Sequence, residues 1–312
     1  MMTVPVASVK VREDGATEIR SWDHRDLDAA CLAGAKSDHH VSVCLPARDE
    51  AETVGPIVAA IREGLIDRWQ LVDEVLVIDD GSSDRTAVVA ADAGARVVLA
   101  ADVLPDYGPG DGKGEALWKS VHAAKGDLLV FCDADVRNFS DRFIVGLLGP
   151  LLLDPTTGFV KGYYRRPVDG GDGGGGRVTE LVARPLISLL FPQLTSIVQP
   201  LAGEFAARRA VLEQVPFAGG YGVDLGLLID VATRFGVESI AQVDLGSRVH
   251  RNRPLDQLAP QALAVLHAAL RRAGVDLPTE RSVALALPGE LVDVALSERP
   301  AMVGVAAYRQ AR

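Results

Sequence analysis

From Val41 onward, short runs of β-branched and apolar residues alternate with amphipathic stretches of helical period. Strands are predicted at residues 41–45, 74–78, 96–99, 127–132, 159–164, 204–207 and 240–249, and helices at about residues 53–65, 84–93, 114–124, 141–152 and 223–235. Strands that alternate with helices form parallel βαβ units, with helices on both faces of one sheet. The alternation therefore predicts an α/β fold.

The pattern divides the chain into three segments. Residues 1–38 are polar and mixed, and we interpret them as an N-terminal arm. Residues 39–254 hold the alternating pattern and are predicted to form the catalytic domain. Residues 255–312 read as mainly helical to about Ala273, so a helical C-terminal extension that serves dimerisation is expected. With 48% hydrophobic residues, a chain of 312 residues can build a hydrophobic core for a catalytic domain of this length.

Composition narrows the choice of partners. The net charge of −10 argues against a broad nucleic-acid surface, whereas local arginine clusters such as Arg165-Arg166 and Arg248 to Arg253 indicate a small anionic ligand. The three cysteines have no metal-type spacing, which favours a reducing, cytoplasmic compartment. No run reaches the roughly 18 apolar residues of a membrane helix, so no membrane partner is expected.

Polar segments follow three of the predicted strands directly. These segments are Pro46 to Glu50, Asp79 to Ser83 and Asp133 to Asp135. In parallel sheets, ligands bind outside the carboxyl ends of the strands where the strand order reverses, so the three segments should share one crevice. Their carboxylates can accept hydrogen bonds from a uracil ring or a ribose, although ordinary turn and helix-cap chemistry explains each segment taken alone.

The pair Asp133 and Asp135 lies one residue apart after a buried strand, an arrangement that can hold a divalent cation. His250 ends the last predicted strand and could complete such a site, or it could be a surface histidine among arginines. Lys113 lies in a turn-rich loop before a helix, where it can reach a diphosphate or simply face solvent.

The segment Gly176 to Thr179 ends a glycine-rich run and enters a helical stretch. Glycine amides, the fork of Arg177 and the hydroxyl of Thr179 together suit an acceptor that carries phosphate or carboxylate groups. A linker with incidental polar residues would have the same composition.

Two sets of motifs resemble known families. A strand followed by Pro46-Ala47-x-x-Glu50, a second followed by Asp80-Gly81-Ser82, and then Asp133-x-Asp135 resemble the nucleotide-sugar glycosyltransferases of the GT-A fold. A second set is similar to the glucosyl-3-phosphoglycerate synthases of actinobacteria, and its members are Gly173 to Glu180, Pro200 to Phe205, Gly220 to Asp224 and Arg248 to Asn252. The resemblance implies a GT-A fold, with a mixed, mainly parallel sheet, over about Val41 to Asn252.

The resemblance also implies roles for single residues. Asp135 and His250 would bind a divalent metal, Mg²⁺ or Mn²⁺, while Lys113 and Asp224 would act in catalysis. The expected contacts to the sugar nucleotide are Pro46, Ala47, Arg48, Asp49, Glu50, Asp80, Lys113, Asp133, Ala134, Tyr221, Gly222, Val223, Asp224, Arg248, Arg251 and Arg253. The expected contacts to 3-phosphoglycerate are Gly176, Arg177, Val178, Thr179 and Asn252. The family usually has Glu where this chain has Asp224, so the reach of that carboxylate is one methylene shorter.

The activity implied is transfer of glucose from UDP-glucose to the 2-hydroxyl of 3-phospho-D-glycerate, with retention at the anomeric carbon. The mannosyl version of this reaction, from GDP-mannose, is the nearest alternative. A nucleotidyltransferase and a non-catalytic module that binds sugar nucleotides are more distant ones. A nucleotidyltransferase is disfavoured because the usual glycine-rich basic signature after the first strand is missing.

Overall fold

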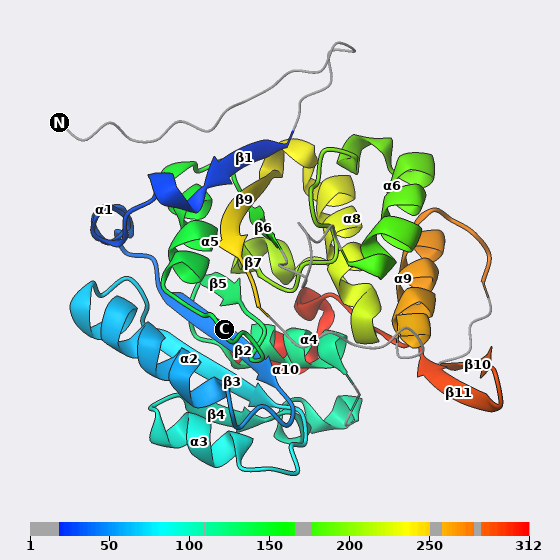
Figure 1. Ribbon diagram of the computed structural model, residues 1–312, viewed down its shortest axis with the longest axis horizontal. Helices are drawn as coiled ribbons and strands as arrows, with labels where there is room; N and C mark the ends of the chain where they lie inside the picture. Colours follow the sequence, from blue (N-terminus) through cyan, green and yellow to red (C-terminus); the bar gives the residue numbers. More distant parts are fainter. Residues whose placement is uncertain are drawn as a thin grey trace.

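The computed structural model describes residues 19–108, 110, 112–165, 176–249, 258–277 and 282–311. Its centre is an eight-stranded sheet of order β1-β9-β6-β7-β5-β2-β3-β4 (Figure 1). The strands of this sheet are β1 Arg20–Asp23, β2 Val41–Ala47, β3 Glu74–Asp79, β4 Arg96–Leu99, β5 Leu128–Phe131, β6 Phe159–Arg165, β7 Phe205–Arg208 and β9 Ile240–Ser247.

The strand directions confirm a mixed and mainly parallel sheet. Strand β7 pairs antiparallel with β5 and β6, and the remaining pairs in the sheet are parallel. The chain runs outward from β2 to β3 and β4, and then returns to β5 on the other side of β2. The strand order therefore reverses at β2 and β5, where the sequence predicted the crevice.

Helices cover both faces of the sheet (Figure 1). They are α1 Ala29–Ala35, α2 Val54–Ile61, α3 Thr86–Asp92, α4 Lys113–Ala123, α5 Arg142–Leu153, α6 Arg184–Leu190, α7 Arg209–Leu212, α8 Val223–Phe235, α9 Ala259–Arg272 and α10 Ala306–Ala311. The predicted helix at residues 53–65 is α2, which continues as a π-helical segment over Arg62–Arg68. None of the helices in the described residues is long and apolar enough to cross a membrane.

Alternate residues of the central strands face two separate cores. In β5, Leu129 and Phe131 pack with α4 and α8, whereas Leu128 and Val130 pack with α2 and α5. Successive side chains of a strand point to opposite faces, so a sheet covered on both sides has apolar residues in both registers. This is why the strands read as nearly continuous apolar runs.

The N-terminal and C-terminal segments differ from the sequence predictions. Within the predicted arm, β1 pairs in parallel with β9 and extends the sheet. The expectation of a helical C-terminal extension is wrong for residues 282–295, which form a hairpin of β10 Ser282–Leu287 and β11 Glu290–Ala295. Both runs alternate with period two around the turn at Gly289, whose φ of +88° suits glycine. One face of the hairpin packs on α9 (Figure 1).

After the hairpin, the chain returns to the body of the molecule. Strand β12 Glu298–Arg299 pairs antiparallel with β8 Phe217–Ala218. Arg299 binds the buried carboxylate of Glu115, and the indole of Trp118 donates to the carbonyl oxygen of Pro300 at 2.8 Å. The C-terminal segment therefore supports the first turns of α4.

Candidate active site

The loops after β2 and β3 are held together by hydrogen bonds. Asp49, with a φ of +56°, accepts bonds from the Ser83 amide at 2.7 Å and the Ser83 hydroxyl at 3.0 Å. The Glu50 amide donates to the Thr86 hydroxyl at 2.8 Å. Because of the bonds from Ser83, the pKa of Asp49 lies below its usual range. Asp49 thus holds the crevice wall in shape.

A third segment meets these two loops. The Thr53 hydroxyl donates to the Ala134 carbonyl at 2.6 Å, which ties the start of α2 to the segment after β5. Arg48 lies 3.9 Å from the Asp80 carboxylate. The structure therefore brings together the three post-strand segments that the sequence predicted to share a crevice.

Lys113 is the first residue of α4, and glycines bring it close to the sheet. Gly112 caps the helix with a φ of +79°, a conformation that favours glycine. A Cβ on Gly114 would lie 2.1 Å from the Ala218 carbonyl oxygen, so only glycine fits there. The backbone of α4 can therefore approach β8 and place the Lys113 ammonium over the carboxyl ends of the strands.

Six charged side chains form a row of alternating sign across this crevice, which we call the charge row. In order they are Asp135, Arg248, Asp133, Lys113, Asp224 and Lys161. Arg248 Nη2 lies 2.6 Å from Asp135 Oδ1 and 2.9 Å from Asp133 Oδ2. Lys113 Nζ lies 3.3 Å from Asp133 Oδ1 and 3.1 Å from Asp224 Oδ2. Lys161 Nζ ends the row, 3.5 Å from Asp224 Oδ1.

Arg248 has further partners on its buried side. Its Nη1 lies 3.2 Å from the Glu204 carboxylate and donates to the Tyr164 hydroxyl at 2.7 Å. Glu204 directly precedes β7 and is fully buried. A Cβ on the neighbouring Gly203 would lie 2.3 Å from Asp133 Oδ2, so a glycine there leaves room for the Asp133 carboxylate.

The sheet explains why these residues meet. Strands β5, β6 and β9 are parallel, so their carboxyl ends lie at one edge, and the antiparallel β7 brings its amino end to the same edge. Asp133 and Arg248 follow β5 and β9, and Glu204 precedes β7. The register also pairs Lys161 with Phe205, the residue next to Glu204.

In the charge row, burial and the neighbouring charges shift the pKa values of the side chains in opposite directions. Burial by itself would raise the pKa of Asp133, but Lys113 and Arg248 hold it well below its usual range. Burial would lower the pKa of Lys113, but Asp133 and Asp224 raise it above its usual range. Burial raises the pKa of Glu204 in spite of Arg248. The middle of the row is therefore ionised, a state that suits the binding of a charged ligand.

Other predicted site residues occupy different environments. The side chains of Ala47 and Val223 lie in the two cores, so they could meet a ligand only through their backbones. In the predicted acceptor segment, Arg177 is exposed, Thr179 is buried, and the helical turn that begins there contacts α9. His250, Arg251, Asn252 and Arg253 lie outside the described residues.

Two members of the site were not identified as functional residues from the sequence. Lys161 and Glu204 are both buried, and each has an atom without a hydrogen-bond partner among the described residues. A charged residue inside an apolar strand run, as in Phe159 to Tyr164, is the signal that could have revealed Lys161.

The donor chemistry of Asp135 suits a hard divalent metal. Its side chain is 35% exposed, at the open end of the charge row, and carboxylate oxygens are preferred ligands of Mg²⁺ and Mn²⁺. In the part of the chain that the structure describes, no three His, Cys, Asp or Glu side chains are grouped to hold a metal. Asp135 therefore fits one arm of the predicted metal site, and the role of His250 stays a prediction.

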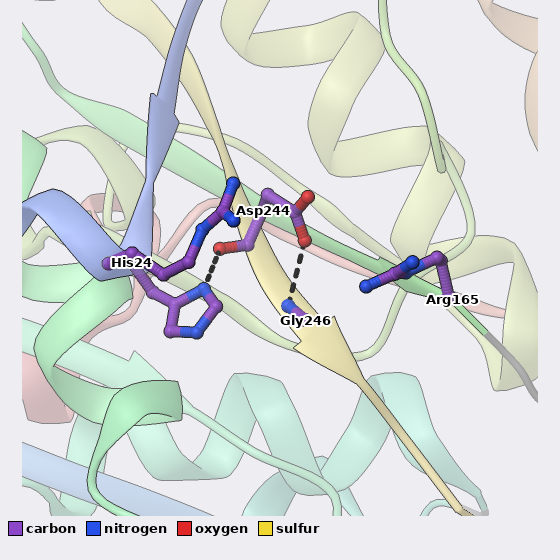
Figure 2. Close-up of a pocket in the computed structure, with 5 residues that line it drawn as sticks. His24, Arg165, Asp244 and Gly246 are labelled. Atoms are coloured by element: carbon purple, nitrogen blue, oxygen red, sulfur yellow. Dashed lines mark hydrogen bonds between the residues drawn. The ribbon is translucent and has the colours of Figure 1, made fainter.

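A separate hollow of about 360 Å³ lies beside the ends of β1, β6 and β9 (Figure 2). It is lined by His24, Arg25, Arg165, Asp244 and Gly246. Within it, His24 Nδ1 donates to the Asp244 carbonyl at 2.8 Å, and the Gly246 amide donates to the Asp244 carboxylate at 2.7 Å. None of these five residues belongs to the predicted site, so we place the candidate site at the charge row.

Comparisons with known proteins agree with this geometry. Residues 42–215 match the model of the family described as "Glycosyl transferase family 2". A glucosyl-3-phosphoglycerate synthase of Mycolicibacterium paratuberculosis is 48% identical over 82% of this chain and 79% of its own length.

Two solved structures are also similar. The glucosyl-3-phosphoglycerate synthase of Mycobacterium tuberculosis in complex with Mn²⁺, UDP-glucose and phosphoglyceric acid superposes with a TM-score of 0.83, at 42% identity over 92% of this chain and 98% of that one. The mannosyl-3-phosphoglycerate synthase of Rubrobacter xylanophilus has the same TM-score of 0.83, at 39% identity over 92% of this chain and 97% of that one. These relatives, together with the GT-A-like sheet and the charge row, show that the chain belongs to the glucosyl-3-phosphoglycerate synthase family of glycosyltransferases.

Proposed function

We propose that this protein transfers glucose from UDP-glucose to the 2-hydroxyl of 3-phospho-D-glycerate, with retention at the anomeric carbon. The charge row is the observation that carries the proposal. It places Lys113 between two carboxylates at the carboxyl edge of the sheet, with Asp135 partly exposed at one end and Asp224 buried next to Lys161 at the other. A diphosphate needs cations on one side, and a sugar needs a hydrogen-bond acceptor on the other.

In this mechanism the chain's own cations stabilise the leaving group. Lys113 neutralises charge that develops on UDP as the glycosidic bond breaks, which is where electrostatic stabilisation has the largest effect. Asp133 contacts the nucleotide, and Asp224 accepts a hydrogen bond from the glucose. When bound by Asp135 and His250, Mg²⁺ or Mn²⁺ supplies further positive charge next to the diphosphate.

The proton of the acceptor hydroxyl goes to a departing phosphate oxygen on the same face. The reaction then needs no general base, and attack on the same face retains the configuration. The carboxylates of Asp133, Asp135, Glu204 and Asp224 are each held by a cation, so none is assigned the role of the nucleophile that retaining hydrolases use. The acceptor's phosphate and carboxylate bind at Gly176 to Thr179 and Asn252.

Turnover with both substrates tests the proposal. The protein is incubated with UDP-glucose and 3-phosphoglycerate, with and without Mg²⁺ or Mn²⁺, and both UDP and the glucosylated product are quantified. We expect metal-dependent formation of the two in equal amounts. UDP release without glucosyl-3-phosphoglycerate, or no turnover in any metal, would exclude the proposed reaction.

The mannosyl reaction is the second candidate. It is favoured by the structural similarity to the Rubrobacter xylanophilus protein, since a change of sugar and base needs only a few contacts. Assaying GDP-mannose beside UDP-glucose at equal concentrations separates the two reactions. A higher kcat/KM with GDP-mannose would overturn the choice of donor.

We further propose that the protein works as a cytoplasmic homodimer, with no nucleic-acid or membrane partner. Leu181, Leu189 and Leu291 are each more than 70% exposed, and a second copy of the chain would cover apolar surface of this kind. The three cysteines are free thiols, which fits a reducing compartment. Sedimentation of wild type beside Leu189→Glu tests the dimer: a monomeric wild type would refute it.

A further inference from the structure

Lys161 lies at the buried end of the charge row and has no role in the reaction described above. It comes from the middle of β6, and its side chain is 1% exposed. Its ammonium lies 5.5 Å from the centre of the Phe205 ring. Among the described residues the ammonium has no hydrogen-bond partner, and its nearest counter-charge is Asp224 at 3.5 Å.

A buried ammonium is costly unless an opposite charge compensates for it. Burial lowers the pKa of Lys161, and the carboxylate of Asp224 acts against that shift. The compensation is mutual, because Asp224 is itself 4% exposed and needs a cation on each side. An apolar side chain at position 161 would fill the same space without this cost. Packing alone therefore does not explain why the residue is a lysine.

Asp224 is held from two directions. Its Oδ2 accepts a hydrogen bond from Lys113 on α4 at 3.1 Å, and its Oδ1 faces Lys161 on β6. Two cations on separate elements fix the plane of the carboxylate as well as its position. Without Lys161, Lys113 would be the one cation among the described residues that holds Asp224, and the carboxylate could turn with the lysine toward Asp133.

We propose that Lys161 is a positioning residue that orients Asp224 toward the sugar of the donor. The inference rests on the proposed function, in which Asp224 contacts the glucose and Lys113 and Asp133 contact UDP. Lys161 belongs to the sugar side of the charge row and is separated from Asp133 by Lys113 and Asp224. Its removal should therefore weaken recognition of the sugar while leaving recognition of the nucleotide nearly intact.

The test compares binding of UDP with binding of UDP-glucose, both by calorimetry in Mn²⁺. Lys161→Met keeps the length of the side chain without its charge. We expect this variant to bind UDP-glucose about tenfold more weakly and UDP within about twofold of wild type. Lys36→Met is the matched control, because Lys36 is also mostly buried and pairs with Asp73 at the opposite edge of the sheet. It should leave both affinities unchanged.

A second comparison introduces Lys161→Met into Asp224→Asn, where it leaves no carboxylate at position 224 without its cation. Asp224→Asn and the double variant Asp224→Asn/Lys161→Met should bind UDP-glucose equally, because Lys161 acts through the carboxylate. A further loss in the double variant would overturn the inference, as would Lys161→Met with wild-type affinity for UDP-glucose. If the wild type binds UDP-glucose no more tightly than UDP, the proposed function is wrong, and the inference about Lys161, which rests on it, is wrong as well.

Discussion

Replacing Arg248 with methionine removes the cation with the most carboxylate partners in the site. Its guanidinium lies within 3.2 Å of oxygens of Asp133, Asp135 and Glu204 and is 5% exposed. Asp133 keeps Lys113 in the variant, but Glu204 is fully buried and loses its cation. Removing one partner of a buried ion pair costs about 3–5 kcal/mol, because the other charge stays buried without compensation.

That cost predicts the size of the thermal effect. For a chain of this size, a loss of 1 kcal/mol lowers Tm by about 2 °C, so Arg248→Met should melt roughly 6–10 °C below wild type near neutral pH. Arg137→Met is the control, because Arg137 is 55% exposed and its partner Glu52 is 80% exposed. Removing such a surface pair costs less than about 1 kcal/mol.

The loss should also depend on pH. The folded-state pKa of Glu204 is already raised, and without Arg248 it rises further. A carboxyl with a raised folded pKa stabilises the fold below its unfolded pKa, and this contribution is lost as the pH rises through the folded pKa. Asp133, whose folded pKa is lowered, contributes stability above its unfolded pKa, and the variant loses part of that contribution. The Glu204 effect makes the deficit of Arg248→Met larger at about pH 8 than at about pH 5, whereas the Asp133 effect is nearly the same at the two values because both lie above its unfolded pKa.

Differential scanning fluorimetry at the two pH values measures both effects. A variant that melts within about 1 °C of wild type at pH 8 would refute the argument that Arg248 compensates for buried carboxylates. A deficit that grows as the pH falls would refute the assignment of its origin to Glu204.

Three other substitutions follow from the same geometry. Gly203→Ala would place a Cβ 2.3 Å from Asp133 Oδ2. We expect the free energy of unfolding to fall by about 1–3 kcal/mol and calorimetry to show weaker UDP binding. An unchanged affinity for UDP would contradict this contact. Asp135→Ala should weaken Mn²⁺ binding at least about tenfold, measured by electron paramagnetic resonance, with little change in Tm. Wild-type affinity for Mn²⁺ in this variant would show that Asp135 is not a metal ligand. Arg299→Met removes the guanidinium that lies 3.0 Å from Glu115. Amide hydrogen exchange over residues 113–118 should therefore be faster than in wild type, and the KM for UDP-glucose should rise. Equal exchange rates in variant and wild type would show that the C-terminal segment does not support Lys113.

The sequence alone determined the central elements of the fold. Helix α8 and strand β4 have the predicted bounds, and β2, β3 and β5 agree with prediction to within two residues at each end. These elements carry an apolar period over several residues, which is a local property of the chain. The crevice at the reversal of strand order followed from the same pattern. So did the choice of Lys113, Asp133 and Asp135 as candidate residues, because each lies directly at the end of a strand or the start of a helix.

Only the tertiary structure decided how the site is connected. Strand β1 is four residues long, too short to show a period, and its pairing with β9 joins residues more than two hundred positions apart. The sequence predicts Arg248 at the nucleotide, and the fold adds its ion pairs with Asp133 and Asp135. The contact between Lys161 and Asp224 cannot be predicted from either segment alone. The physical reason is that strand register, set by the packing of the whole sheet, brings distant charges within reach of one another. The sequence shows which residues can carry charge at the crevice, and the fold decides which of those charges compensate each other.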